Sequence, residues 1–168
     1  MNVSLIGMSG CGKSVVGERL ALRLDMRFFD VDAEIEKEQN MKISEIFDKF
    51  GEAEFRRLER EKISRLAELT NAVISTGGGV VLDVENIRAL KRSSIVVFID
   101  RSVEDILADL DNSNRPLLRD KSKVRELYDK RIGLYREYAD VIVHNVGTVE
   151  DVVGKIENLV GTVALDRP

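Results

Sequence analysis

The fold of this 168-residue chain is decided by Gly7-Met8-Ser9-Gly10-Cys11-Gly12-Lys13-Ser14. This stretch matches the pattern G-x-x-x-x-G-K-[ST] directly after an apolar run and directly before a helical pattern. Its glycines let the backbone wrap a phosphate group with N–H groups, and the following helix directs its positive end at the same anion. The stretch therefore predicts a nucleotide-binding loop, and the alternative of a glycine-rich turn without a ligand is disfavoured by its position.

Single positions of this loop have separate expected roles. Lys13 would reach the β and γ phosphates, and the Ser14 hydroxyl would ligate Mg²⁺. Cys11 is interpreted as a small filler, with a reactive thiol prone to modification as the alternative. The nucleotide is expected to contact Gly10, Cys11, Gly12, Lys13, Ser14 and Val15.

Composition predicts one compact domain. The chain is 43% hydrophobic, which suffices for a core, and we place a single domain at 1–163 and a flexible tail at 164–168. The formal net charge of −4, with mixed acids and bases, indicates neither a nucleic-acid footprint nor a basic membrane patch. Because no run approaches the roughly 18 residues of a membrane span and no cationic leader is visible, we expect a cytoplasmic protein.

Short apolar runs alternate with helical patterns along the chain, which is typical of an α/β fold with a parallel sheet. The expected strands are 3–6, 28–29, 72–74, 95–99 and 141–143. The expected helices follow the loop and then cover about 32–39, 43–50, 53–69, 84–90, 103–110, 124–138 and 149–159. The polar segment at 111–116 is expected to be a mobile loop.

Two carboxylates, Asp30 and Asp32, follow the second expected strand. Ligands of open α/β sheets gather beyond the carboxyl ends of strands, so Asp32 is placed to meet a substrate hydroxyl and accept its proton. Asp30 would organise Mg²⁺ through water. The alternative is that Asp32 only caps the next helix at Ala33.

A pair of arginines stands in the helical segment 54–59, which reads EFRRLE. Two adjacent helical residues point about 100° apart, so one arginine turns inward while the other stays in water. Arg56 and Glu59 are spaced so that the glutamate can orient the guanidinium toward a substrate carboxylate. Arg131, in a later helix, would be the second member of a carboxylate clamp. A solvated, salt-bridged face is the alternative.

Three consecutive glycines, Gly77, Gly78 and Gly79, follow the third expected strand. Three glycines are costly to order, and close backbone approach to a substrate would justify them. A tight turn without a ligand is the alternative.

Arg115 lies in the expected mobile loop, followed by Pro116, Leu117 and Leu118. A loop of this kind closes over ligands, and Arg115 would then offset charge that develops on the transferring phosphate. A plain surface charge is the alternative.

Six motifs in order, found between about Val3 and about Ile156, resemble the shikimate kinase family. They are GMSGCGKS at 7–14, D-x-D at 30–32, EFRRLE at 54–59, GGG at 77–79, RPLL at 115–118 and R-x-x-x-Y at 131–135. Only the first is specific alone, whereas the ordered set is highly specific. The resemblance implies a three-layer α/β/α fold like that of nucleoside-monophosphate kinases, with five parallel strands in the order 2-3-1-4-5.

The reaction implied by the resemblance is transfer of the ATP γ-phosphate to the 3-hydroxyl of shikimate, on the way to chorismate and the aromatic amino acids. Asp32 would then hold ring hydroxyls and act as base, while Arg56 and Arg131 would clamp the carboxylate and Glu59 would hold Arg56. Backbone contacts would come from Gly77, Gly78 and Gly79. The small-molecule partner would be shikimate, and we expect a monomer that needs ATP and Mg²⁺.

The nucleotide end carries the remaining implied roles. Lys13 and Arg115 would bracket the γ-phosphate, Ser14 would bind Mg²⁺, and Asp30 would support the metal through water. In this model of the domain, helices within about 32–60 bind substrate and residues about 111–121 form a lid.

One segment departs from the family pattern. The adenine loop of this family often ends in proline, whereas 144–148 reads HNVGT. Backbone contacts at Val146 and Gly147 would still hold the adenine. His144 is disfavoured as a base, since Asp32 is available and positioning dominates phosphoryl transfer.

Three alternatives remain beside this assignment. A kinase of another polyol acid, such as gluconate, would use the same loop. A regulatory nucleotide switch would need the loop without paired inward arginines. A catalytically inactive homologue is disfavoured because every expected catalytic position is present.

Overall fold

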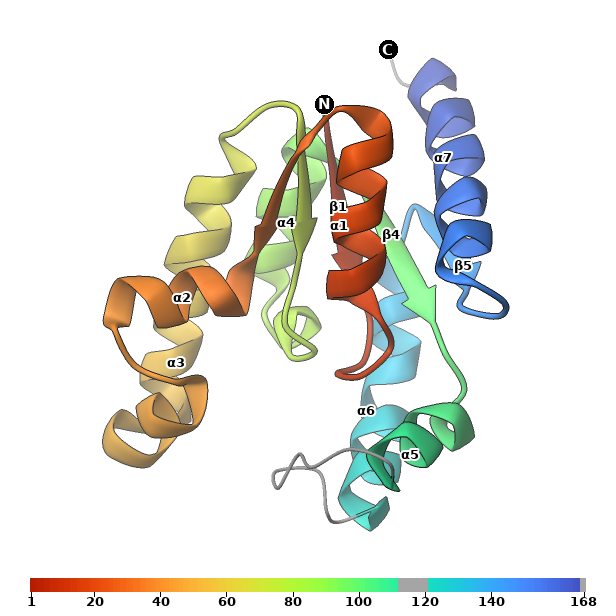
Figure 1. The fold of residues 1–168 in the computed structure, drawn as a ribbon. Helices are drawn as coiled ribbons and strands as arrows, with labels where there is room; N and C mark the ends of the chain where they lie inside the picture. The colour runs from red at the N-terminus through yellow and green to blue at the C-terminus, as the bar shows by residue number, and fades with distance from the viewer. Residues whose placement is uncertain (112–120, 167–168) are drawn as a thin grey trace.

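The computed structural model describes residues 1–111 and 121–166, and these form a parallel sheet between two layers of helices (Figure 1). The strands are β1 (Asn2–Ile6), β2 (Arg27–Asp30), β3 (Ala72–Ser75), β4 (Ser94–Asp100) and β5 (Val141–His144). Neighbouring strands pair in parallel in the order β2-β3-β1-β4-β5. Every residue of β1, β3 and β4 is buried, because helices cover both faces. The expected fold class, the five strands and their order are confirmed.

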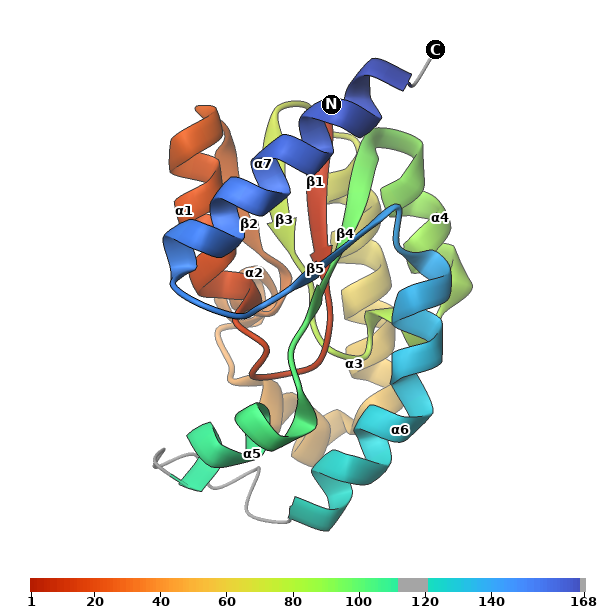
Figure 2. The same cartoon turned by 90° about the vertical axis from the view of Figure 1, so that its right-hand side faces the viewer.

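The helices form the two outer layers. They are α1 (Lys13–Leu24), α2 (Val31–Gln39), α3 (Ile43–Ala67), α4 (Val84–Ser93), α5 (Val103–Asp111), α6 (Lys121–Tyr138) and α7 (Val149–Asp166). One face of the sheet carries α1 and α7 side by side, and the other carries α3, α4 and α6 (Figure 2). None of the helices in the described ranges is long and apolar enough to cross a membrane.

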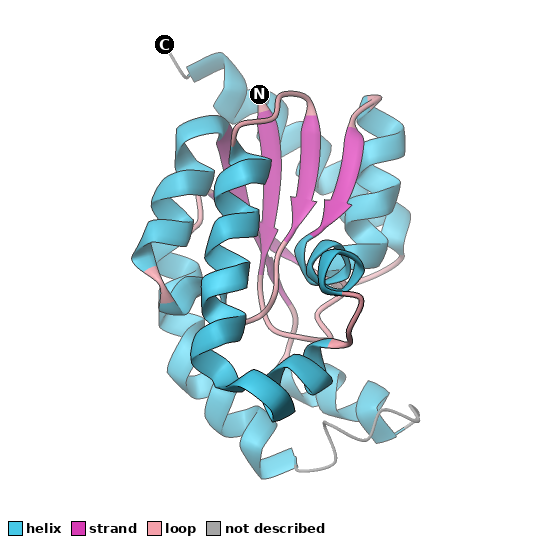
Figure 3. Ribbon diagram, turned by 90° about the vertical axis from the view of Figure 1, so that its left-hand side faces the viewer, coloured by secondary structure: helices cyan, strands magenta, loops and turns pink. Residues whose placement is uncertain are grey.

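The helix α3 contains a break that the sequence anticipated as two helices. Gly51 has φ 83° and ψ 169°, and the chain changes direction there (Figure 3). A Cβ atom built on Gly51 would meet nothing within 4 Å. Glycine is therefore favoured at this position by its backbone torsion and not by crowding.

The remaining segments were predicted less completely from the sequence. The short 3₁₀ helix η1 (Val80–Leu82) was not expected. The tail expected from residue 164 overlaps the end of α7, which continues to Asp166, and Ala164 packs on the core. The expected lid at about 111–121 lies, apart from its helical ends Asp111 and Lys121, outside the described residues.

Tyr135 of α6 connects the core to the loop that follows β3. Its side chain is fully buried, and its ring stacks on Phe98 of β4 with centroids 5.2 Å apart. Its hydroxyl donates a 2.5 Å hydrogen bond to the Gly78 carbonyl oxygen. Burial raises the pKa of Tyr135 well above its usual range, so the hydroxyl stays a donor at any ordinary pH. The glycine turn is thus anchored from beneath.

Gly17 of α1 makes the close contact between this helix and the sheet. A Cβ atom there would lie 2.7 Å from Phe28 Cε2 and 3.0 Å from Leu5 Cδ1. We expect Gly17→Ala to lower the free energy of unfolding by about 1–3 kcal/mol, because overpacking outweighs the gain in helix propensity. Urea denaturation monitored by circular dichroism measures the change.

Gly154→Ala in α7 is the matched control, because a Cβ atom there would meet nothing within 4 Å. This variant should gain about 0.5–1 kcal/mol from helix propensity alone. Equal effects of the two substitutions would contradict the crowding that we assign to Gly17.

Candidate active site

A cleft of about 650 Å³ opens at the carboxyl ends of the central strands. Its walls come from four segments that follow β1, β2, β3 and β4 in turn, which is where ligands of open α/β sheets bind. The phosphate-binding loop forms one wall, and Asp30, Asp32, Gly77 and Gly78 form another. The structure thus brings the predicted nucleotide loop and three of the predicted acceptor residues, Asp32, Gly77 and Gly78, to one cleft.

The phosphate-binding loop is held in an anion-binding conformation. Gly10 and Gly12 have φ values of 82° and 97°, in the left-handed region that glycine tolerates best. The Lys13 ammonium is buried and donates to the carbonyl oxygens of Gly7 at 2.7 Å and Met8 at 2.8 Å. Gly12 caps α1, whose first N–H groups have no partner within the helix and face the loop. Lys13, Ser14 and Val15 all line the cleft.

Cys11 is packed inside this loop. Its side chain is 1% exposed, and its Sγ atom would lie 2.8 Å from a Cβ atom on Gly7. Sγ also lies 3.6 Å from the Lys13 ammonium. This burial favours the interpretation of Cys11 as a small filler over that of a reactive thiol.

Ser14 and Asp30, the two residues predicted to serve a metal, lie against each other. The Ser14 hydroxyl donates a 2.6 Å hydrogen bond to Asp30 Oδ2, and both residues line the cleft. A hydroxyl and a carboxylate are hard oxygen ligands, which suit Mg²⁺. The described residues contain no group of three His, Cys, Asp or Glu side chains that could hold a metal ion.

Asp30 is also the N-cap residue of α2. Its side chain accepts a 3.1 Å hydrogen bond from the Ala33 amide, and α2 begins at Val31. The alternative that Asp32 caps this helix is therefore wrong. Asp32 lies in the first turn of α2 with its carboxylate directed at the cleft.

The Asp32 carboxylate is partly desolvated. Burial is the largest cause that raises its pKa to about 6, and the charges of Asp30 and Glu59 raise it further. Lys13 and Arg56 act in the opposite direction. Within the described part of the chain, Asp32 Oδ1 is buried and has no hydrogen-bond partner. Asp32 is thus a carboxylate with an unused acceptor, and it changes charge near neutral pH.

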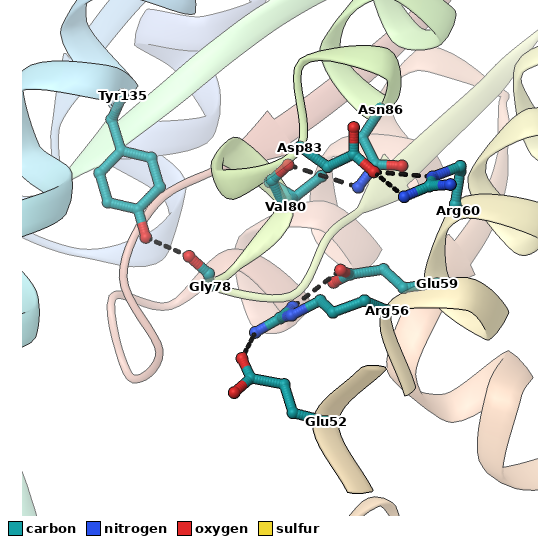
Figure 4. A network of polar contacts seen from close by, with 9 residues as sticks. All are labelled: Glu52, Arg56, Glu59, Arg60, Gly78, Val80, Asp83, Asn86 and Tyr135. Atoms are coloured by element: carbon teal, nitrogen blue, oxygen red, sulfur yellow. Dashed lines mark hydrogen bonds and ion pairs between the residues drawn. The ribbon is translucent and has the colours of Figure 1, made fainter. Parts of the chain in front are cut away.

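Arg56 and Arg57 diverge from one turn of α3, as the sequence predicted. The Arg57 side chain is 51% exposed and pairs with Glu54 and Glu61. The Arg56 side chain is 20% exposed and donates to Glu59 Oε2 at 2.8 Å, while Glu59 is 1% exposed (Figure 4). The solvated-face alternative is wrong for Arg56.

Glu59 orients the Arg56 guanidinium through this ion pair. Burial raises the Glu59 pKa, and the positive charges of Arg56 and Arg131 oppose this shift. Among the described residues, Arg56 Nε and Glu59 Oε1 are buried without hydrogen-bond partners. The pair therefore keeps an unused donor, Arg56 Nε, that a carboxylate or hydroxyl oxygen could satisfy.

The three glycines make room for these side chains. A Cβ atom on Gly79 would lie 2.3–2.6 Å from the Arg56 guanidinium, which no real contact permits. One on Gly77 would lie 3.0 Å from Asp32 Oδ1 and 3.1 Å from Glu59 Oε1. The close approach that we predicted for a substrate is thus already used by the charged side chains of the site.

Arg131 lies on the other side of the same turn. Its Nη1 atom would be 3.7 Å from a Cβ atom on Gly78, and its charge acts on Glu59. Arg56 and Arg131 therefore come from α3 and α6 to flank one glycine turn. The distance between Arg56 and Arg131 in the sequence did not indicate that they lie near one turn, and only their residue type suggested a shared role.

The remaining predicted site residues are Arg115 and Val146. Arg115 lies outside the described residues. Val146 is described and 67% exposed, in the segment between β5 and α7. The structure leaves their predicted roles as predictions.

Several residues at the site were missed by sequence reasoning. Thr76, Arg101, Ile106 and Asp109 line the cleft, and Asn145 contacts the phosphate-binding loop. Arg101 and Asn145 each follow a predicted strand, so the rule that ligands gather at strand ends could have identified them.

Comparison with known proteins places this architecture in a family. The family model "Shikimate kinase" matches residues 9–160. A curated shikimate kinase of Clostridium botulinum (strain Eklund 17B / Type B) is 43% identical over 159 residues, which cover 94% of this chain and 96% of the relative.

Solved structures agree with this match. The structure "Shikimate kinase from Acinetobacter baumannii in complex with shikimate" has a TM-score of 0.89 and 37% identity, and the match covers 96% of this chain and 93% of that chain. A gluconokinase from Sinorhizobium meliloti 1021 covers 99% of this chain and 97% of its own, with a TM-score of 0.59 and only 14% identity, which shows the fold alone. The chain belongs to the shikimate kinase family.

Proposed function

We propose that the protein transfers the γ-phosphate of ATP to the 3-hydroxyl of shikimate, giving shikimate 3-phosphate and ADP in the pathway to chorismate and the aromatic amino acids. The observation that carries this proposal is the cleft that joins the phosphate-binding loop to Asp32 and to the glycine turn against which Arg56 lies. Shikimate combines a carboxylate with ring hydroxyls, and the cluster offers a guanidinium and a carboxylate with unused buried atoms.

The nucleotide end supports transfer by positioning and charge. The loop N–H groups and the positive end of α1 would hold the β and γ phosphates of ATP, with Lys13 at the loop mouth. Ser14 and Asp30 would hold Mg²⁺, the latter through water. The metal would neutralise charge on the phosphate oxygens when it is bound. Arg115 would add a second cation, and Val146 would contact the adenine through its backbone.

The acceptor end would orient the attacking hydroxyl. Arg56 and Arg131 would clamp the shikimate carboxylate by charge-assisted hydrogen bonds, with Glu59 holding Arg56 in place. Asp32 would accept the hydroxyl proton or hold that hydroxyl in line with the γ-phosphate. Gly77, Gly78 and Gly79 would add backbone contacts beside these side chains.

The competing assignments differ in what they require of this cluster. A gluconate kinase would also need hydroxyl and carboxylate contacts, but the gluconokinase that matches this chain shares little beyond the fold. A nucleotide switch would not need a buried Arg56–Glu59 pair beside a second binding region. The acceptor assay below separates the three.

ADP release coupled to a spectrophotometric assay, with Mg²⁺-ATP and either shikimate, gluconate, quinate or no acceptor, tests the reaction. We expect release that depends on shikimate. In Arg56→Ala the shikimate KM should rise about 10- to 100-fold, because a charge-assisted hydrogen bond is worth about 1.5–3 kcal/mol, while the ATP KM stays within about twofold.

Arg57→Ala is the matched control, because this neighbouring arginine is half exposed and points into water. It should behave as the parent. Thermal denaturation of both variants separates a lost substrate contact from instability, since Arg56→Ala leaves Glu59 buried and unpaired. ADP release without an acceptor, or with gluconate alone, would overturn the acceptor assignment and leave the nucleotide loop standing.

The raised pKa of Asp32 predicts a specific pH profile. If ionised Asp32 binds the acceptor hydroxyl, kcat/KM for shikimate should be level above a pH of about 6, where the pKa lies, and fall about tenfold per pH unit below it. Initial rates between pH 5 and 8 at saturating ATP measure the profile. A level profile down to pH 5 would contradict the assignment.

Asp32→Asn supplies the stability control. The raised pKa means that ionised Asp32 destabilises the fold, fully above a pH of about 6 and not at all below the ordinary value of 3.8. The free energy of unfolding of Asp32→Asn should therefore exceed that of the parent by about 1–3 kcal/mol at pH 7. The difference between the two proteins should vanish near pH 4.

Gly79→Ala tests the role of the glycine turn. The added methyl group would displace the Arg56 guanidinium, which lies 2.3–2.6 Å from the new atom. We expect the shikimate KM to rise at least tenfold and the ATP KM to stay unchanged in steady-state assays. Gly133→Ala, where a Cβ atom meets nothing within 4 Å, is the control. An unchanged shikimate KM in Gly79→Ala would show that the guanidinium position is unimportant.

A further inference from the structure

The carbonyl oxygens of the phosphate-binding loop are bound by side chains from three directions. Those of Gly7 and Met8 accept hydrogen bonds from Lys13. Two further carbonyl oxygens of the loop accept hydrogen bonds from residues far away in the sequence. The Gly10 carbonyl oxygen accepts from Arg101 Nη1 at 3.2 Å, and the Cys11 carbonyl oxygen accepts from Asn145 Nδ2 at 2.7 Å.

Arg101 and Asn145 come from equivalent places in the sheet. Arg101 directly follows β4 and Asn145 directly follows β5, and these strands are neighbours. The backbone N–H of Asn145 also donates to the Asp100 carbonyl oxygen at 2.7 Å, which fixes the position of the Asn145 backbone. The two side chains thus reach the loop from the half of the sheet that is opposite to Asp32 and Arg56.

Arg101 makes a second polar contact, and Asn145 packs closely on the loop. Arg101 is 22% exposed and pairs with Asp109 at 2.5 Å. A Cβ atom on Gly12 would lie 2.8 Å from Asn145 Nδ2, so the loop and the amide group are in close contact. Gly12 is therefore required by this contact as well as by its left-handed torsion.

A peptide group that points its carbonyl oxygen to one side points the amide of the next residue to the other. Bonds that hold the carbonyl oxygens of Gly10 and Cys11 outward therefore direct the amides of Cys11 and Gly12 away from Arg101 and Asn145. The Cys11 amide is used within the loop, donating to Met8 at 3.2 Å, whereas the Gly12 amide precedes the first turn of α1. The two side chains thus fix the orientation of two peptide groups of the loop.

We propose that Arg101 and Asn145 are positioning residues that preorganise the phosphate-binding loop for the nucleotide. This inference rests on the proposed function, because it requires that the loop binds ATP. Asn145 gives the cleaner test, since the described lining of the cleft includes Arg101 but not Asn145. The Asn145 side chain contacts the loop at the Cys11 carbonyl oxygen.

The test is isothermal titration calorimetry with Mg²⁺-ADP and, separately, with shikimate in the absence of nucleotide. Asn145→Ala removes the donor and should weaken Mg²⁺-ADP binding about five- to tenfold. Asn145→Asp keeps the shape but sets a carboxylate against the Cys11 carbonyl, and it should weaken binding more. Shikimate affinity should stay within about twofold in both, because Asp32 and Arg56 are untouched.

Arg101 is examined in the same way. Arg101→Ala should weaken Mg²⁺-ADP binding, and Arg101→Lys should recover part of the loss because it keeps a cationic donor. His144→Ala is the matched control: His144 precedes Asn145, is 72% exposed and lies 3.3 Å from Asp100 instead of the loop. It should bind both ligands as the parent does.

The outcomes are distinguishable. If the parent binds Mg²⁺-ADP and phosphorylates shikimate but both Asn145 variants bind Mg²⁺-ADP within twofold of the parent, the positioning role is overturned and the proposed function stands. An equal loss of affinity for both ligands would indicate general destabilisation and would also overturn it. If the parent bound no Mg²⁺-ADP, the proposed function would fail and the inference with it.

Discussion

The position of β1 in the middle of the sheet is the constraint on which the site depends. Because β1 pairs with β3 on one side and β4 on the other, the loop after β1 lies where the strand order reverses. Residues that follow β2 and β3 reach this loop from one side, and residues that follow β4 and β5 reach it from the other. Asp32, Arg56 and the glycine turn lie on the first side, and the side chains of Arg101 and Asn145 contact the loop from the second.

The acceptor side is organised by space as much as by charge. Glu59 is fully buried, and it tolerates burial because Arg56 neutralises it. The guanidinium can occupy that position because Gly79 has no side chain, and the glycine turn is held by Tyr135 from α6. A carboxylate in α3, an arginine one turn earlier, a glycine after β3 and a tyrosine in α6 thus form one unit. Loss of any member would disturb the others.

Much of this could be predicted from sequence, for physical reasons. Short apolar runs identified all five strands, of which β1, β3 and β4 are buried throughout, whereas the strand order was implied by the resemblance to the family. The loop motif and the separation of Arg56 from Arg57 follow from short-range geometry, which the sequence contains directly. Contacts between distant segments left no such pattern. The bonds from Arg101 and Asn145 to the loop were missed. Capping of α2 was considered only for Asp32, as an alternative role, although Asp30 makes the cap, because two carboxylates two residues apart look alike in sequence.

The break at Gly51 has a consequence for how the protein can vary among its relatives. The arm of α3 before the break contributes one buried side chain, Ile46, and no atom would crowd a side chain at the break itself. The segment after it contributes Phe55, Glu59 and Ile63 to the interior. Mutations before the break are therefore constrained by folding mainly at Ile46, whereas those after it are constrained at each of these three positions. The two arms of one long helix thus evolve under unequal constraint.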